Sequence, residues 1–178
     1  MPSGRTHDRL TWVSVPVVTA SVWWWTAQTP TALAVGCAYL FSGLMFSGDL
    51  DIHSVQYKRW GPLRWLWRPY RKLVTHRSFL SHGPVIGTFG RVVYLGMIVA
   101  LMTTLGVLAG NQWLGGQIEL LAEARKIAHN LEDHLSTIGW ILLGLELGAI
   151  SHSASDWIGS ALRRLQQIPR RQARRGHR

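Results

Sequence analysis

The sequence has a single cysteine and few charged residues for its length. Cys37 has no partner for an intrachain disulfide, so the fold does not depend on an oxidising compartment. Charged residues make up only 16% of the 178 residues, although Lys and Arg outnumber Asp and Glu by 19 to 9. The charges are confined to a few segments. The long uncharged stretches between them are typical of a membrane protein rather than of a soluble basic protein.

The N-terminal apolar run lacks the marks of a cleaved signal peptide. Residues 10–27 are long for the hydrophobic region of a signal peptide, and no clear small-x-small cleavage site follows them. The run ends instead at Gln28-Thr29-Pro30-Thr31. We therefore interpret it as a retained transmembrane helix.

Four apolar stretches predict an all-α membrane bundle of about four transmembrane helices. The second stretch is rich in small residues such as Gly36, Ala38, Ser42 and Gly43, which permit close helix packing. We expect one membrane-embedded domain over residues 1–162 and a basic, disordered tail over 163–178. The predicted spans are residues 10–27, 31–46, 84–109 and about 137–162.

Two connecting segments have distinctive patterns. Residues 54–75 mix Lys and Arg with Trp and Tyr, which is typical of a segment lying among anionic lipid headgroups. A nucleic-acid surface mixes the same residue types, but the flanking apolar spans favour the lipid bilayer, and no nucleic-acid partner is expected. Residues 115–136 have apolar residues at helical spacing and a mostly acidic polar face. They predict an amphipathic helix that lies on the membrane or against a protein partner.

The distribution of Lys and Arg predicts the membrane topology. These residues concentrate near the N-terminus, in residues 54–75 and in the tail, and they are scarce in the other two connections. The positive-inside rule then places the N-terminus, the C-terminus and residues 54–75 in the cytoplasm.

Histidine and aspartate cluster at the ends of the four apolar stretches. Imidazole and carboxylate groups bind divalent metals such as zinc, manganese and iron. The topology, which was deduced from Lys and Arg alone, places all four clusters at one membrane face. We therefore predict a metal site there. Its candidate ligands are His7, Asp49, Asp51, His76, His82, His152 and Asp156.

Local spacing adds detail to this prediction. His152 and Asp156 are four residues apart, so they share one face of a helix and can bind the same ion. Asp49 and Asp51 are two apart, and in an extended chain both carboxylates would point the same way. His76 and His82 are expected to meet across a turn.

The segments around these clusters resemble a known family. Residues 3–8, 47–54, 76–84 and 152–156 are similar to an uncharacterised bacterial family of membrane metal-binding proteins that is common in cyanobacteria. More distantly, the early His, the Asp-x-Asp pair, the His-Arg-x-x-x-x-His element and the late His-x-x-x-Asp resemble the YdjM-like, LexA-binding inner-membrane metal-dependent hydrolases. The resemblance implies metal binding more directly than it implies hydrolysis.

The sequence thus predicts a membrane metalloprotein that hydrolyses a phosphoester or lipid-like substrate at the cytoplasmic face. Seven ligands exceed the needs of one tetrahedral zinc, which favours two ions. In this hypothesis Arg77 stabilises negative charge on the substrate, and Asp51 or Asp156 transfers a proton. Asp8 or His53 would orient a ligand. The alternative is a non-enzymatic membrane subunit or assembly factor with a closed, structural metal site.

Overall fold

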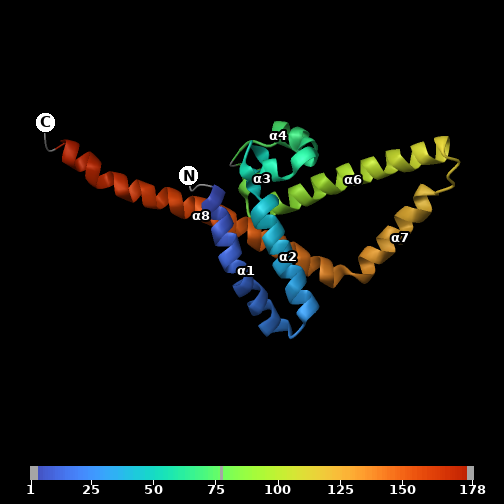
Figure 1. Ribbon diagram of the computed structural model, residues 1–178, viewed down its shortest axis with the longest axis horizontal. Coiled ribbons are helices and arrows are strands. Elements are labelled where there is room, and N and C mark those ends of the chain that lie inside the picture. Colours follow the sequence, from blue (N-terminus) through green and yellow to red (C-terminus); the bar gives the residue numbers. More distant parts are fainter. Residues whose placement is uncertain (1–3, 77, 176–178) are drawn as a thin grey trace.

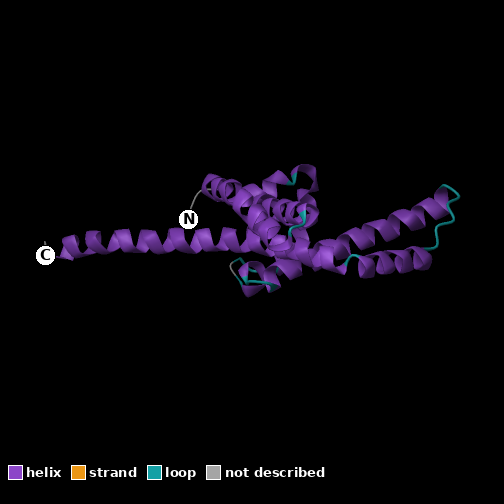
Figure 2. Ribbon diagram, turned by 90° about the horizontal axis from the view of Figure 1, so that it is seen from below, coloured by secondary structure: helices purple, strands orange, loops and turns teal. Residues whose placement is uncertain are grey.

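The computed structural model describes residues 4–76 and 78–175, with side chains from residue 6 to 161 apart from residue 77. All regular elements in these residues are helices, which confirms the all-α prediction (Figure 2). In chain order they are α1 (Gly4–Thr26), α2 (Thr29–Met45), η1 (Gly48–Asp51), α3 (Val55–Arg59), η2 (Gly61–Trp67), α4 (Arg68–Leu73), α5 (Phe79–His82), α6 (Ile86–Trp113), α7 (Leu120–Asp133) and α8 (Leu135–Arg175).

Helices α1, α2 and α8 pack together at the centre of the molecule. Helices α1 and α2 form an antiparallel hairpin, and α8 crosses α2 (Figure 1). A Cβ atom at Gly144 of α8 would lie 2.6 Å from the Val35 carbonyl oxygen of α2, so only glycine permits this approach. At the same crossing Ser42 donates a hydrogen bond to the Leu145 carbonyl oxygen (2.5 Å). The expectation that small residues of α2 allow close packing is confirmed.

Among the described residues, three helices are long and apolar enough to cross a membrane. They cover Thr29–Asp51, Ile86–Trp113 and Leu135–Ala161. Helix α1 is not among them. The N-terminal span, the cytoplasmic termini and the separate tail over residues 163–178 stay predictions, and α8 itself continues to Arg175.

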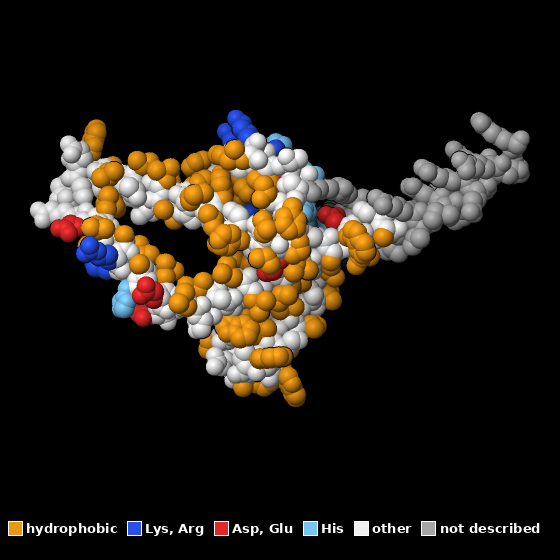
Figure 3. Space-filling view, turned by 180° about the vertical axis from the view of Figure 1, so that it is seen from behind, with side chains coloured by type: hydrophobic (Ala, Val, Ile, Leu, Met, Phe, Trp, Pro, Cys, Tyr) orange, Lys and Arg blue, Asp and Glu red, His pale blue; other side chains and the backbone are white. Residues whose placement is uncertain are grey.

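Helices α6 and α7 extend away from the central bundle (Figure 1). The most apolar part of α6 has no buried residue, and α7 has none along its length. Hydrophobic side chains therefore cover the outward faces of the long helices, with charged side chains gathered in a few groups (Figure 3). Helix α7 is amphipathic as predicted, whereas its contact with a membrane or a protein partner stays a prediction.

The basic segment between α2 and α6 folds over the end of the bundle as α3, η2 and α4. Its aromatic residues were expected to lie among lipid headgroups, but the structure buries three of them, Tyr57, Trp67 and Tyr70. Trp67 is fully buried, and its ring contacts Phe46, which directly follows α2, and Tyr70 of α4, with centroids 5.6 Å away in each case. The contact with Phe46 packs the segment against the end of α2, two residues before η1, which carries part of the candidate site.

Candidate metal centre

All seven predicted ligands lie close together where η1 and α5 meet the start of α1 and the middle of α8. Helix α1 provides His7, α8 provides His152 and Asp156, and η1 provides Asp49 and Asp51. His76 and His82 come from the turn before α5 and from the end of α5. The four histidine and aspartate clusters of the sequence thus form one site, and their role as ligands stays a prediction.

A first triad consists of His7, His152 and Asp156. One potential ligand atom from each residue lies within 4.8 Å of the other two. Asp156 places one oxygen 3.2 Å from His7 Nε2 and the other 4.0 Å from His152 Nε2. The two imidazole rings are 4.1 Å apart between centroids. His152 and Asp156 share one helix face, as their spacing predicts.

A second triad consists of Asp49, His76 and His82, again with ligand atoms within 4.8 Å of one another. His82 Nε2 lies 3.5 Å from Asp49 Oδ1. Asp51 is buried beside this triad. Its Oδ1 lies 2.8 Å from His76 Nδ1, and its Oδ2 lies 4.0 Å from His82 Nδ1.

Asp49 belongs to the second triad and also faces the first. Its Oδ1 faces His82 at 3.5 Å, and its Oδ2 faces His152 Nε2 at 3.2 Å. One carboxylate therefore reaches imidazoles from both triads. A carboxylate in this position is suited to bridging two metal ions, as in sites where two ions share a ligand.

The prediction that the chain is extended at Asp49 and Asp51 is wrong. Residues 48–51 form the 3-10 helix η1, in which residues two apart point in different directions. Asp49 consequently faces His82 and His152, whereas Asp51 faces His76. The two carboxylates do not form a parallel pair: both approach the His82 ring, Asp49 at Nε2 and Asp51 at Nδ1.

Three buried atoms of the site have no hydrogen-bond partner among the described residues: His82 Nε2, His152 Nε2 and Asp51 Oδ2. His152 Nε2 is close enough to Asp49 for a hydrogen bond, but its direction is wrong for one. Buried polar atoms without partners are rare and cost free energy. A divalent metal ion would satisfy such atoms, so the residues present fit the predicted metal.

Three polar side chains orient the histidines, and the sequence analysis missed all of them. Ser155 lies 2.5 Å from His7 Nδ1, Ser81 lies 2.8 Å from His82 Nδ1, and Gln56 Nε2 lies 3.4 Å from His152 Nδ1. Each contact occupies Nδ1 and leaves Nε2 facing the carboxylates. Such contacts fix ring orientation in metal sites. The two serines stand within the histidine motifs, so proximity could have indicated them, whereas nothing in the sequence singles out Gln56.

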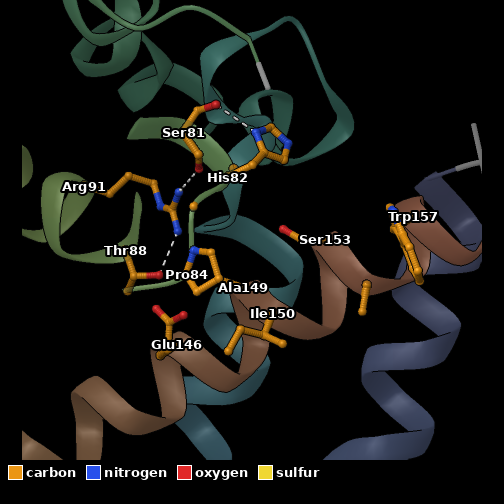
Figure 4. Close-up of a pocket in the computed structure, with 13 residues that line it drawn as sticks. Ser81, His82, Pro84, Thr88, Arg91, Glu146, Ala149, Ile150, Ser153 and Trp157 are labelled. Atoms are coloured by element: carbon orange, nitrogen blue, oxygen red, sulfur yellow. Dashed lines mark hydrogen bonds between the residues drawn. The ribbon is translucent and has the colours of Figure 1, made fainter. Parts of the chain in front are cut away.

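Helix α5, which carries His82, is held by a buried arginine (Figure 4). Arg91 of α6 donates to the Ser81 carbonyl oxygen (2.7 Å) and to Thr88 Oγ1 (3.0 Å). On the other side, a Cβ atom at Gly48 would lie 2.9 Å from the His82 ring. The position of His82 thus depends on α6 and on the absence of a side chain at residue 48.

We expect Gly48→Ala to weaken metal binding by displacing His82, because the added methyl group overlaps the imidazole ring. The loss should be about tenfold or more for one ion, comparable to removing an orienting contact. Equilibrium dialysis with zinc measures this loss. Gly90→Ala is the control, because a Cβ atom at residue 90 would meet nothing within 4 Å. Equal affinity in the two variants would contradict the role of Gly48.

The electrostatic environment of His7 favours the form that binds metals. Burial lowers the pKa of His7, and the nearby His152 lowers it further, while Asp156 and Asp49 oppose this effect. A lowered pKa keeps the imidazole neutral at neutral pH. Neutral imidazole is the form that coordinates a metal.

Two residues expected to orient ligands have other partners. Both oxygens of Asp8 accept hydrogen bonds from Arg59, and this pairing raises the pKa of Arg59. His53 packs edge-on against the Tyr57 ring and lies 3.4 Å from Arg71 Nη1. The predicted catalytic residue Arg77 lies outside the described residues.

A cavity of about 180 Å³ opens beside the two triads. Residues from both triads line it, including His7, His152 and Asp156 from the first and Asp49 and His76 from the second. Gln56 and Ser54 complete part of its wall. The candidate ligands are therefore accessible from one side.

The family comparison agrees with the chemistry of these side chains. The family model described as "Uncharacterized metal-binding protein (DUF2227)" matches residues 2–166. The chain belongs to this family. The match spans all seven candidate ligands, from His7 to Asp156. No curated protein and no solved structure matches the chain, so the distant resemblance to YdjM-like hydrolases gains no support from them.

Proposed function

We propose that this DUF2227 protein binds two divalent metal ions, which share Asp49, and hydrolyses a phosphoester or lipid-like substrate at the cytoplasmic membrane face. The observation that carries the proposal is the position of Asp49, whose two oxygens face histidines of different triads. His7, His152 and Asp156 would hold one ion, and His76 and His82 the other.

Two such ions, when bound, supply Lewis-acid activation of water and neutralise charge on a phosphoryl group. The protein's own residues would orient the substrate and accept protons. Asp51 lies beside the second triad, and its Oδ2 has no hydrogen-bond partner among the side chains that the structure describes. This oxygen is available to accept a proton from an attacking water, the role predicted for Asp51 from the sequence.

The open cavity favours an enzyme over the alternative of a structural site. Structural metal sites are closed by protein on all sides. Here a cavity of about 180 Å³ reaches five of the candidate ligands, which leaves room for a water molecule and a substrate group. A non-enzymatic subunit would have no need of this access.

A second cavity supports an amphiphilic substrate. It has a volume of about 340 Å³, and His82 of the second triad forms part of its wall (Figure 4). Much of the rest of the wall is apolar, with Pro84, Ala149, Ile150 and Trp157. An apolar chain in this cavity would hold a polar head near His82. The three apolar helices are consistent with access to such a substrate from a bilayer.

The test is hydrolysis by detergent-purified protein loaded separately with zinc, manganese or iron. The substrates are bis(p-nitrophenyl) phosphate and a short-chain phospholipid. We expect turnover that requires metal and that falls by about a hundredfold or more in Asp51→Asn, because proton transfer contributes on this scale. Asp51→Asn should keep at least one bound ion. Fully loaded wild-type protein without turnover on either substrate would favour the structural alternative.

A further inference from the structure

A third cavity, separate from the metal centre, has a strongly basic lining. Its volume is about 490 Å³, within the usual range for small-molecule sites. It lies in the segment that links α2 to α6. The residues that line it are His53, Tyr57, Lys58, Arg64, Arg68, Arg71 and Lys72.

The positive charges of this basic pocket are not neutralised by acidic side chains in the described part of the chain. Five of its seven lining residues are Lys or Arg, and none is Asp or Glu. Over the described side chains, no acidic residue forms an ion pair with any of these five cations. The neighbouring Arg59, in contrast, is paired with Asp8. Because like charges repel at short range, such a concentration favours an anion in the pocket.

Contacts within the basic pocket hold the Arg71 side chain in a defined position. Its guanidinium lies over the Tyr57 ring, 4.8 Å from the centroid, and Nη1 lies 3.4 Å from His53 Nδ1. Its buried Nε has no hydrogen-bond partner among the described residues. The side chain is thus held in one place with a donor unused.

We propose that the basic pocket binds a phosphate group, carried by a lipid headgroup or by a soluble molecule. Arginine presents a planar set of donors that matches phosphate oxygens in a bidentate geometry, and lysine adds compact charge. The pocket contains three arginines and two lysines. Its segment connects the ends of two candidate membrane spans, Thr29–Asp51 and Ile86–Trp113, which is where a headgroup would be encountered.

This site does not depend on the proposed metal centre. The basic pocket and the cavity of the metal centre share no lining residue. His53 lines the basic pocket, whereas its neighbours Ile52 and Ser54 line the cavity of the metal centre. Phosphate bound at metal ions and phosphate bound at the basic pocket are therefore distinguishable by substitution.

The experiment measures phosphate binding to detergent-purified full-length protein. Isothermal titration calorimetry follows inorganic pyrophosphate, and native mass spectrometry in neutral detergent follows phosphatidic acid. We expect the double variant Arg64→Gln/Arg68→Gln to bind at least one probe about tenfold or more weakly, because it loses charged hydrogen bonds. Both side chains are exposed, so the variant should fold. Arg71→Gln provides a second variant with the same expected direction.

Two controls make the outcome decisive. Arg125→Gln, Lys126→Gln removes the same charge from the exposed helix α7 and should change binding by less than about threefold. Asp49→Asn alters the metal centre and should leave binding at the basic pocket unchanged. Selective binding of phosphatidic acid identifies a lipid headgroup, and binding of both probes identifies any accessible phosphate. Failure of both probes to bind, or equal losses in the pocket and α7 variants, would overturn the proposal.

Discussion

Replacing Asp49 with asparagine should weaken binding of both metal ions, whereas replacing a histidine of one triad should remove one ion. Asp49 reaches His152 of the first triad and His82 of the second, so loss of its charge affects both. We expect affinity to fall by about a hundredfold or more for each ion, since even orienting partners of ligands contribute up to this amount. His7→Ala and His76→Ala each change a single triad.

Metal titrations monitored by calorimetry measure this pattern. The expected result is two binding events in wild type, one in each histidine variant and two weakened events in Asp49→Asn. His129→Ala is the matched control, because His129 lies on the exposed α7 and pairs only with Asp133 in the described chain. If Asp49→Asn lost one ion and bound the other normally, Asp49 would belong to a single site.

Leucine at position 148 should destabilise the protein and also abolish metal binding. A Cβ atom at Gly148 would lie 2.5 Å from the Tyr39 carbonyl oxygen and 2.7 Å from Ser42 Cβ, so α8 and α2 would have to separate. Overpacking in a close contact typically costs about 1–3 kcal/mol. His152 stands four residues further along α8, so the separation also displaces a candidate ligand.

Thermal unfolding of Gly148→Leu and Gly139→Leu in the same detergent provides the comparison. Gly139 lies on α8 as well, but a Cβ atom there would meet nothing within 4 Å. We expect a Tm lowered by several degrees for Gly148→Leu only. Equal Tm values for the two variants would show that the close crossing of α2 and α8 does not hold the protein together.

The sequence predicted the helices and the meeting of the histidine and aspartate clusters for physical reasons. Apolar length determines a helix that can span a bilayer. The Lys and Arg distribution led to the expectation that the clusters meet, although the membrane topology itself stays a prediction. His152 and Asp156 share a helix face because helical geometry is fixed locally. These features depend on short-range rules, which a sequence shows directly.

Features that depend on tertiary packing were not predicted. The orientation of Asp49 and Asp51 follows from η1, whose Gly48 packs against the His82 ring, a contact between residues far apart in the chain. The contact of Gln56 with His152 likewise joins distant segments. Trp67 resembles an interfacial tryptophan in sequence, and its burial depends on Phe46 and Tyr70.

Metal stoichiometry tests the central claim most directly. Wild-type protein, purified in detergent without chelators and saturated with zinc, manganese or iron, is analysed by inductively coupled plasma mass spectrometry together with His82→Ala, His152→Ala. The two triads that share Asp49 predict two ions per chain in the wild type and none in the double variant. Wild-type protein that retains no metal after loading with any of the three would contradict the account, and the histidines and aspartates would then be polar packing groups.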